Sequence, residues 1–508
     1  MDHTSDTVHN FLYLRRLGID THQEPVVYMR QDCDVCKSEG FNAHSRVRVS
    51  SGGRSIIATV NVVTQDFLSH QEAGLSEAAW RLLGASDGDK AHFAHTRPVD
   101  SMSYVRGKLY GNTLDAVAAD AIIQDVTHGY YSDIQLTAFV TACAGSRLSP
   151  PEVTALTQAM VRVGERIDWG HLPVMDKHCV GGLPGNRTTP LAVAIVSSCG
   201  LIMPKTSSRA ITSPAGTADT MEVMAPVELS LSQMRRVVEQ EGGCIAWGGS
   251  VSLSPADDVL IRIERALDLD SEGQMVASVL SKKIAAGSSH VLLDIPVGPT
   301  AKVRNRTFGE RLAAQLTSTG ETLGLTIRTH LSDGSQPIGR GIGPALEARD
   351  ILQVLRGDPQ APQDLRQRAL QLAGMILEMG GVMAAGEGLG KATEVLDSGL
   401  ALRKFLAICE AQGGFREPTL APHRFEVSAS RRGIVSQINN RFVAKLAKLA
   451  GAPADPRAGL DFQVQLGQKV DLGEPLFVIH AESPGELAYT LEFLREHPDE
   501  ISIVDESL

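Results

Sequence analysis

The chain has 508 residues, a formal net charge of −11, 43% hydrophobic and 21% charged residues, which is the composition of a globular protein. The acidic balance speaks against nucleic-acid binding, because proteins that bind nucleic acid carry an excess of lysine and arginine. We find no uninterrupted apolar stretch of about 20 residues, as a membrane span requires, and the opening residues MDHTSDTVHN lack the regions of a secretion signal. We therefore expect a cytoplasmic protein with neither membrane nor nucleic-acid partners.

The first 95 residues predict a small β-rich domain. Short apolar runs at Val26–Met29, Val47–Val49 and Ser55–Val63 alternate with polar turns such as Ser51–Gly53.

This domain contains a CxxC pair, Cys33 and Cys36. A structural zinc site needs four ligands, and no second cysteine pair follows at metal-binding spacing. We interpret the pair as reduced structural thiols and expect no bound metal.

From about Val99 to Leu148 the apolar residues recur at three- and four-residue steps, which predicts amphipathic helices. The first stripe breaks at His128-Gly129 and a second begins at Ile134. The first stripe comprises Leu114, Val117, Ala118, Ala121, Ile122 and Val126.

The middle of the chain alternates apolar strands, such as Val291–Ile295, with helices and glycine-rich loops, which favours a mainly parallel sheet covered by helices. Beyond about Pro418 short strands return around a helix expected over Asn440–Leu449, which predicts a C-terminal α+β module. Strands are expected there at Gly433–Val435, Phe462–Leu466 and Pro475–His480.

The segment Met175–Pro190 has the features of an anion-binding loop. A strand end carrying Lys177 is followed by glycines and then by Thr188, Thr189 and Pro190 as the first residues of a helix. Such a helix start offers backbone N–H groups to an anion, and a lysine adds a positive charge. The spacing matches neither the P-loop nor the dinucleotide-binding motif.

A second polar loop follows at Pro204–Asp219 and is dense in hydroxyl and cationic side chains. Either loop alone could be an ordinary structural turn. Two such loops joined by one short helix favour a bound anion.

These loops resemble those of the thymidine/pyrimidine-nucleoside phosphorylase family. The matching motifs are Asp176–Gly182, Lys205–Arg209, Ala215–Asp219, Ser278–Lys283, Asp333–Pro344 and Asp397–Gly399. The insertion Pro184–Asn186 and the run Ser208–Ser213 are similar to the longer branch, which includes archaeal AMP phosphorylases and bacterial proteins classed as thymidine phosphorylases. The similarity runs from about residue 97 to the C-terminus.

The resemblance implies an α/β fold in which a helical subdomain faces a large mixed α/β domain across a cleft, with an N-terminal β-rich and a C-terminal α+β domain. The expected boundaries are 1–95 for the N-terminal domain, 97–168 plus about 257–284 for the helical subdomain, 170–256 plus about 285–415 for the α/β domain, and 420–508 for the C-terminal domain.

The resemblance also implies roles for individual residues. Phosphate would be held by Lys177, Gly181, Gly182, Thr189, Ser207 and Thr217. His178, Lys282 and Asp270 would serve catalysis, Asp270 as the suggested proton donor to the leaving base. Further substrate contacts would come from Ser208, Arg209, Ala210, Ile211, Thr212, Ser213, Ser278 and Lys302.

The sequence departs from the family pattern at Cys179, where the family commonly has a phosphate-binding serine, and a thiol is a weaker donor than a hydroxyl. The base-contacting arginine of the pyrimidine enzymes has no clear match either, because Arg262 and Arg265 both lie near the expected place. Structural alternatives also stand beside three assignments: His178 as a buried histidine, Asp270 as part of a capping turn, and Lys282 as a surface charge.

The implied reaction is phosphorolysis of an N-glycosidic bond, thymidine and phosphate giving thymine and 2-deoxyribose 1-phosphate. It needs a dense set of donors to hold phosphate in line with the anomeric carbon and a group that neutralises the departing base. We expect no cofactor, with inorganic phosphate as co-substrate, and a homodimer or higher homo-oligomer. Two alternatives stay open: a phosphorylase of AMP or another nucleoside 5′-monophosphate giving ribose 1,5-bisphosphate, and a non-catalytic nucleotide-binding regulator.

Overall fold

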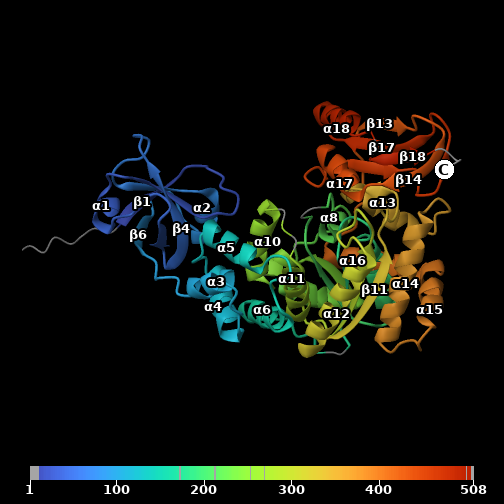
Figure 1. The fold of residues 1–508 in the computed structure, drawn as a ribbon, viewed down its shortest axis with the longest axis horizontal. Helices are drawn as coiled ribbons and strands as arrows, with labels where there is room; N and C mark the ends of the chain where they lie inside the picture. Colours follow the sequence, from blue (N-terminus) through green and yellow to red (C-terminus); the bar gives the residue numbers. More distant parts are fainter. Residues whose placement is uncertain are drawn as a thin grey trace, which may run out of the picture. The chain divides into compact units, whose positions relative to one another are not determined.

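The computed structural model describes residues 11–170, 173–210, 213–251, 253–267, 269, 271–498 and 500–504. The chain divides into two compact units (Figure 1), one of Met1–Arg147 with Val259–Leu269 and one of Leu148–Asp258 with Asp270–Leu508. Each unit is described separately.

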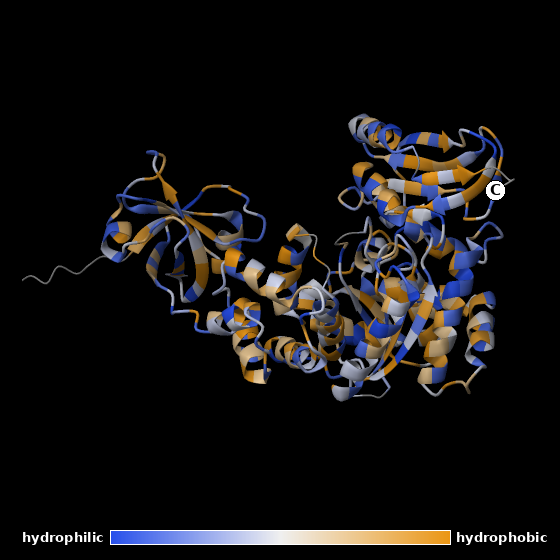
Figure 2. Cartoon of the chain, viewed as in Figure 1, coloured by the Kyte–Doolittle hydropathy of each residue, from blue (hydrophilic) through white to orange (hydrophobic). Residues whose placement is uncertain are grey.

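The first unit begins with a closed barrel in which the strands are ordered β1-β5-β2-β4-β3-β6. Buried and exposed residues alternate along β1 and β6, and the barrel strands alternate likewise in hydropathy in Figure 2. The sequence predicted this β-rich domain and its strands near 26–29, 47–49 and 55–63. The elements are β1 (Phe11–Arg16), β2 (Val26–Arg30), α1 (Asp34–Glu39), β3 (Arg46–Ser51), β4 (Arg54–Val63), β5 (Glu72–Leu75), α2 (Glu77–Leu83) and β6 (Lys90–His95).

The two thiols of the CxxC pair are buried at the start of α1, where the sulfur of Cys33 accepts a hydrogen bond from the N–H of Cys36 at 3.3 Å. Cys33 thus caps the helix. Within the described part of the chain, no three His, Cys, Asp or Glu side chains are grouped so as to hold a metal ion.

Helices follow the barrel, as the periodicity predicted: α3 (Met102–Leu109), α4 (Ala116–Thr127) and α5 (Asp133–Cys143), joined by most of α10 (Pro255–Leu267). Of the first stripe, Leu114 and Ile122 are buried, whereas Val117 is 67% exposed. Val117 lies in the first turn of α4, on the side away from Ala118 and Ile122.

The second unit contains a parallel sheet, as expected. Strands β11 (Thr326–Asp333), β10 (His290–Val297) and β7 (Met175–Cys179) pair in that order, and β8 (Met203–Ser207) pairs with β9 (Gly243–Trp247). A parallel bridge between Val174 and Ile202 joins the two sets, which gives the order β11-β10-β7-β8-β9. From β7 the chain continues to β8 and β9 on one side of the sheet. It then returns to β10, on the other side of β7, and continues to β11.

Helices pack against this sheet around a core rich in Leu, Ile, Val, Ala and Met, which includes Val193, Ile245 and Leu292. The helices of the second unit that precede the C-terminal module are α6 (Pro150–Val163), α7 (Thr188–Ser198), α8 (Thr217–Glu222), α9 (Leu231–Glu241), the short η1 (Gly248–Val251), α11 (Glu272–Ala285), α12 (Arg306–Thr322), α13 (Pro344–Leu355), α14 (Gln363–Met379), α15 (Gly388–Asp397) and α16 (Leu400–Gln412).

The C-terminal part is an antiparallel α+β module with a separate core that includes Val443 and Phe477. The helix expected over 440–449 is present with those bounds, whereas the strand expected over 462–466 ends at Phe462. The elements are β12 (Gly341–Ile342), β13 (His423–Ser428), β14 (Gly433–Ile438), α17 (Asn440–Leu449), β15 (Gly459–Phe462), β16 (Lys469–Val470), β17 (Pro475–Ala481), α18 (Pro484–Glu496) and β18 (Ile501–Val504). Across the described residues, no helix combines the length and hydropathy needed to cross a membrane.

Candidate active site

The order of the parallel strands marks the place where a ligand is expected. In open α/β sheets ligands bind outside the carboxyl ends of the two neighbouring strands from which the chain departs in opposite directions. Here these strands are β7 and β10, so the loops after Cys179 and Val297 form the expected crevice. The glycine loop that the sequence singled out is the first of them.

Lys177 extends from β7 beneath this loop and is fully buried. Its ammonium group donates to the hydroxyl oxygens of Thr188 at 2.7 Å and Thr189 at 3.3 Å, and lies 3.5 Å from the carbonyl oxygen of Gly185. These partners are neutral, and among the described residues no carboxylate lies within ion-pair distance of Lys177. A buried cation without a counterion is costly, so the position suits a bound anion.

The glycine loop itself has a backbone conformation that favours glycine. Gly181 and Gly182 have φ values of +89° and +85°. A Cβ atom at Gly182 would lie 2.6 Å from the backbone nitrogen of Lys302, whereas one at Gly181 would meet nothing within 4 Å. The loop after β7 therefore packs directly on the loop after β10 that carries Lys302.

The start of α7 corrects one expectation. The N–H groups of Thr188 and Thr189 donate to the carbonyls of Gly185 and Asn186 at 3.3 and 3.1 Å. A tight turn leads into the helix and occupies both donors, so the prediction that they are open to an anion was wrong. The ammonium of Lys177 and the glycine segment are the remaining features of the predicted cradle.

The second loop approaches the first. Ser207 ends β8, its hydroxyl 3.4 Å from the carbonyl oxygen of Ser208. A Cβ at Gly216 would lie 2.6 Å from the Ser208 carbonyl oxygen, so the segment before α8 packs on the segment after β8. Thr217, the first residue of α8, lies with its hydroxyl 3.5 Å from the carbonyl oxygen of Asn186 in the glycine loop.

Arg209, a predicted substrate contact, is held by carboxylates. Its guanidinium pairs with Glu222 and, at 3.0 Å, with Glu228, and it lies over the ring of Trp247 at 4.8 Å. These acidic groups raise the pKa of Arg209 further above its ordinary value. Nearby, the N–H of Ala210 donates to Asp219 at 2.6 Å, and the hydroxyl of Ser213 donates to the carbonyl of Ala215 at 2.9 Å.

Helix α11 supplies Ser278 and Lys282, one turn apart and both partly exposed. The ammonium of Lys282 pairs with Asp257 at 2.6 Å. Beside this pair, burial and the charge of Asp257 raise the pKa of Asp258 to about 6.

His178 follows Lys177 on β7. Burial and then the charges of Lys283, Lys205, Lys282 and Lys177 hold the pKa of its imidazole well below 6.5, so the ring is neutral at pH 7. Burial raises the pKa of the Cys179 thiol to about 11, which keeps the thiol protonated.

Sequence reasoning missed a set of buried charges beneath these residues. Asp176 pairs with Lys205 and Lys283, and Arg187 pairs with Glu347 and Asp350. Asp176, Lys205 and Lys283 lie within the family-like motifs, yet nothing in their spacing shows that they meet.

Three predicted residues, Asp270, Ile211 and Thr212, lie outside the described residues. Arg262, one of two candidates for the base-contacting arginine, pairs with Asp133 at 2.7 Å.

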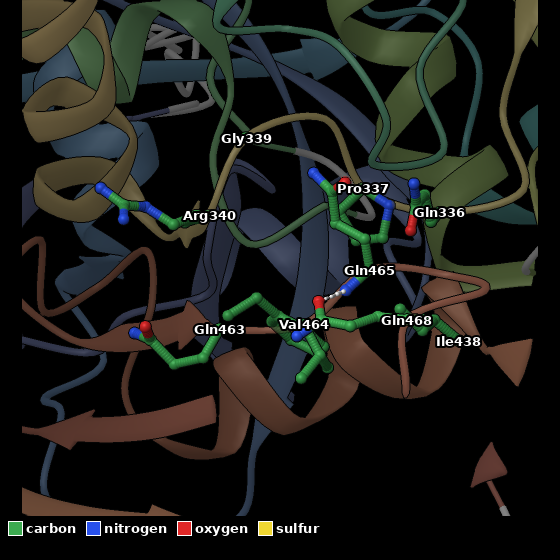
Figure 3. Close-up of a pocket in the computed structure, with 10 residues that line it drawn as sticks. Gln336, Pro337, Gly339, Arg340, Ile438, Gln463, Val464, Gln465 and Gln468 are labelled. Atoms are coloured by element: carbon green, nitrogen blue, oxygen red, sulfur yellow. Dashed lines mark hydrogen bonds between the residues drawn. The ribbon is translucent and has the colours of Figure 1, made fainter. Parts of the chain in front are cut away.

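A separate cavity of about 140 Å³ lies where the segment Gln336–Arg340 meets the C-terminal module. Figure 3 shows Gln465 and Gln468, which are hydrogen-bonded to each other, and Gln336 among its lining side chains. None of the residues expected to hold phosphate is among the described residues that line it, so we do not identify it with the predicted site.

Known proteins and protein families match this chain over most of its length. The model of the glycosyl transferase family a/b domain matches residues 171–402, that of the family's helical bundle domain matches 102–164, and that of the pyrimidine nucleoside phosphorylase C-terminal domain matches 434–497. The protein named "Putative thymidine phosphorylase" from Hahella chejuensis is 71% identical over 98% of this chain and 99% of its own length. Proteins of the same printed name from a Polaromonas strain and from Legionella pneumophila are 60% and 57% identical, over 98% and 96% of this chain and 97% and 94% of their own.

A solved structure shares the fold. The crystal structure of anthranilate phosphoribosyltransferase from Thermus thermophilus superposes with a TM-score of 0.52 at 19% identity, over 61% of this chain and 98% of that one.

Proposed function

Since this chain belongs to the thymidine and pyrimidine-nucleoside phosphorylase family and is a pentosyltransferase, we propose that it cleaves the N-glycosidic bond of thymidine with inorganic phosphate. The products are thymine and 2-deoxyribose 1-phosphate. The observation that carries the proposal is the fully buried ammonium of Lys177, which has hydroxyl and carbonyl partners but no carboxylate among the described residues.

Phosphate is the anion that completes this environment. In the proposed complex it lies against Lys177 and the glycine segment Gly181–Gly182, with Thr189, Ser207 and Thr217 adding hydroxyl donors. Holding a weak dianionic nucleophile in line with C1′ lowers the entropic part of the barrier. Phosphate is the co-substrate, and the proposal assigns no step to a cofactor.

The departing base gains negative charge as the bond breaks. Lys282 carries a positive charge on α11, and the neutral imidazole of His178 donates a hydrogen bond, so both stabilise the base. Asp270 is the proposed proton donor.

The choice of thymidine over a nucleoside 5′-monophosphate is supported by Arg209. A 5′-phosphate would need cationic partners, and Arg209 already pairs with Glu222 and Glu228. In the monophosphate alternative, Lys302 and Ser213 would hold the 5′-phosphate. The backbone of Lys302 adjoins Gly182.

An assay of base release with phosphate decides among the candidates. Purified protein is incubated with thymidine, uridine or AMP in separate reactions. Release of thymine supports the proposal, and release of adenine alone supports the monophosphate alternative. No release from any of them supports the non-catalytic regulator.

Lys177→Met tests the assignment of the phosphate group, with Lys404→Met as a control for loss of a half-buried ion-paired lysine elsewhere. We expect kcat/KM to fall by at least about a hundredfold in Lys177→Met, as when a preorganised donor to a reacting anion is removed. Unchanged phosphate dependence would contradict the assignment.

We further propose that the protein works as a homodimer in the cytoplasm. Support for the dimer comes from exposed apolar side chains on α3, α4 and α5, namely Tyr104, Leu109, Tyr110, Val117 and Ile134.

A further inference from the structure

A cluster of three buried charges lies behind the candidate site. Asp176 on β7, Lys205 on β8 and Lys283 on α11 are 0%, 4% and 3% exposed. The Asp176 carboxylate lies 3.3 Å from the ammonium of Lys205 and 2.8 Å from that of Lys283. The hydroxyl of Ser288 also donates to this carboxylate, at 3.3 Å. One carboxylate thus joins three elements of the site.

Each member of the cluster is next to, or one residue removed from, a residue of the proposed machinery. Asp176 precedes Lys177 and accepts a hydrogen bond from its backbone N–H at 2.7 Å. Lys205 lies two residues before Ser207 on the same strand, and Lys283 follows Lys282 on α11. Movement of Asp176, Lys205 or Lys283 would therefore displace a neighbouring group that is proposed to hold phosphate or base.

The cluster also lies on the same side of β7 as His178. Alternate residues of a strand point to the same side of a sheet, so Asp176 and His178 share one side and Lys177 points to the other. Two ammonium groups share one carboxylate, which leaves an excess of positive charge near the imidazole.

We propose that Asp176, Lys205 and Lys283 form a positioning cluster that fixes β7, β8 and α11 around the bound substrates and whose excess positive charge maintains His178 as a neutral hydrogen-bonding group. This proposal rests on the proposed function.

The charge environment of His178 agrees with this role. Burial lowers the pKa of the imidazole most, and Lys283, Lys205, Lys282 and Lys177 lower it further. Burial also lowers the pKa of Lys205 to about 7, against the opposing effect of Asp176, so Lys205 is charged in the acidic range where a histidine titrates. For Asp176, burial opposes ionisation but the two lysines prevail and lower its pKa, so it remains a carboxylate.

A cluster that only stabilised the fold would behave differently. Its loss would reduce stability without a directed change in the protonation of His178. Lys205→Met and Lys283→Met each remove one positive charge and leave Asp176 with one balancing ammonium, so both variants are expected to fold.

The experiment follows the histidine signals by NMR on selectively labelled full-length protein, with the His178 signal assigned by its absence in His178→Gln. We expect the pKa of His178 to rise toward 6.5 in both lysine variants and to stay unchanged in the control Lys404→Met. A group of pKa 6.5 is about three-quarters protonated at pH 6, and burial of His178 remains in both variants, so the ratio of kcat/KM at pH 6 to that at pH 8 should fall by up to about fourfold relative to wild type.

An unchanged pKa of His178 in both variants would overturn the proposal, as would failure of both to fold while Lys404→Met folds. The titration needs no turnover. If the wild-type protein releases no base, the proposed function fails, and the NMR result still decides whether the cluster controls His178.

Discussion

The thiol of Cys179 lies at the end of β7, in the layer where the proposed phosphate site begins. It is buried and protonated, and a Cβ built on Gly185 would lie 3.8 Å from its sulfur. A hydroxyl is a stronger donor than a thiol, and one added hydrogen bond contributes about 0.5–1.5 kcal/mol.

We expect Cys179→Ser to lower the KM for phosphate by about two- to tenfold with little change in the KM for nucleoside. Initial-rate kinetics at varied phosphate measure this. Cys199→Ser, at a half-buried thiol beyond α7, is the control and should leave both constants unchanged. A higher phosphate KM in Cys179→Ser would show that the thiol contributes no phosphate contact that a hydroxyl can improve.

Glu347 is a residue whose charge works against the fold at neutral pH. Burial raises its pKa to about 7 despite Arg187 nearby, from an ordinary value of 4.5. The folded protein therefore binds more protons than the unfolded chain between these values. The stability from Glu347 is fully present below about pH 4.5 and is lost as the pH rises through 7.

In Glu347→Gln this loss should disappear. Between pH 5 and pH 8 the free energy of unfolding of the second unit falls in wild type, and in the variant this fall should be smaller by up to about 2.5 kcal/mol. Urea unfolding at the two pH values measures the difference, and parallel pH profiles would contradict it. Arg187 keeps Asp350 as a partner in the variant, so its charge is not left unpaired.

Among the elements, those defined by local pattern could be predicted and those defined by contacts between distant segments could not. Helix α17 has the predicted bounds, because the residues that define it are neighbours in the sequence. The closure of the barrel through the pairing of β1 with both β5 and β6 depends on register between segments far apart in sequence. The same applies to the site: Lys177 and the two loops have local signatures, whereas the meeting of Asp176 with Lys283 depends on how α11 packs.

The glycine loop offers a matched pair of substitutions. Gly181 and Gly182 have nearly the same positive φ, so alanine meets similar backbone strain at either position. Only at position 182 would the new Cβ lie 2.6 Å from the backbone of Lys302.

We therefore expect Gly182→Ala to reduce kcat/KM by at least about tenfold more than Gly181→Ala, because it pushes the loop after β7 away from the loop after β10. Steady-state kinetics of the two variants, with thermal melting to show that both are folded, check this expectation. Equal losses would indicate that backbone strain alone controls the loop.

At the scale of the whole molecule, the proposed dimer rests on the distribution of exposed apolar side chains. Tyr110 at the end of α3 is 89% exposed, Val117 on α4 is 67% exposed and Ile134 on α5 is 81% exposed. Helix α3 packs against both α4 and α5 in the first unit. An isolated exposed apolar residue needs no explanation, but several on contacting helices are typical of an interface. A closed symmetric dimer would bury the same surface on both copies.

Val117→Asp combined with Ile134→Asp places charges in this surface and should convert the dimer into monomers at micromolar concentration, because an unpaired charge buried at an interface costs several kcal/mol. Light scattering coupled to size-exclusion chromatography measures the mass. Tyr489→Asp changes a residue of similar exposure, 68%, on α18 of the second unit and should leave the mass unchanged. A monomeric wild-type protein would contradict the proposed dimer. Dissociation by Tyr489→Asp but not by the double variant would show that the interface lies elsewhere. Because the three helices lie in the first unit and Lys177 in the second, the double variant should keep its affinity for phosphate, which separates loss of assembly from loss of the site.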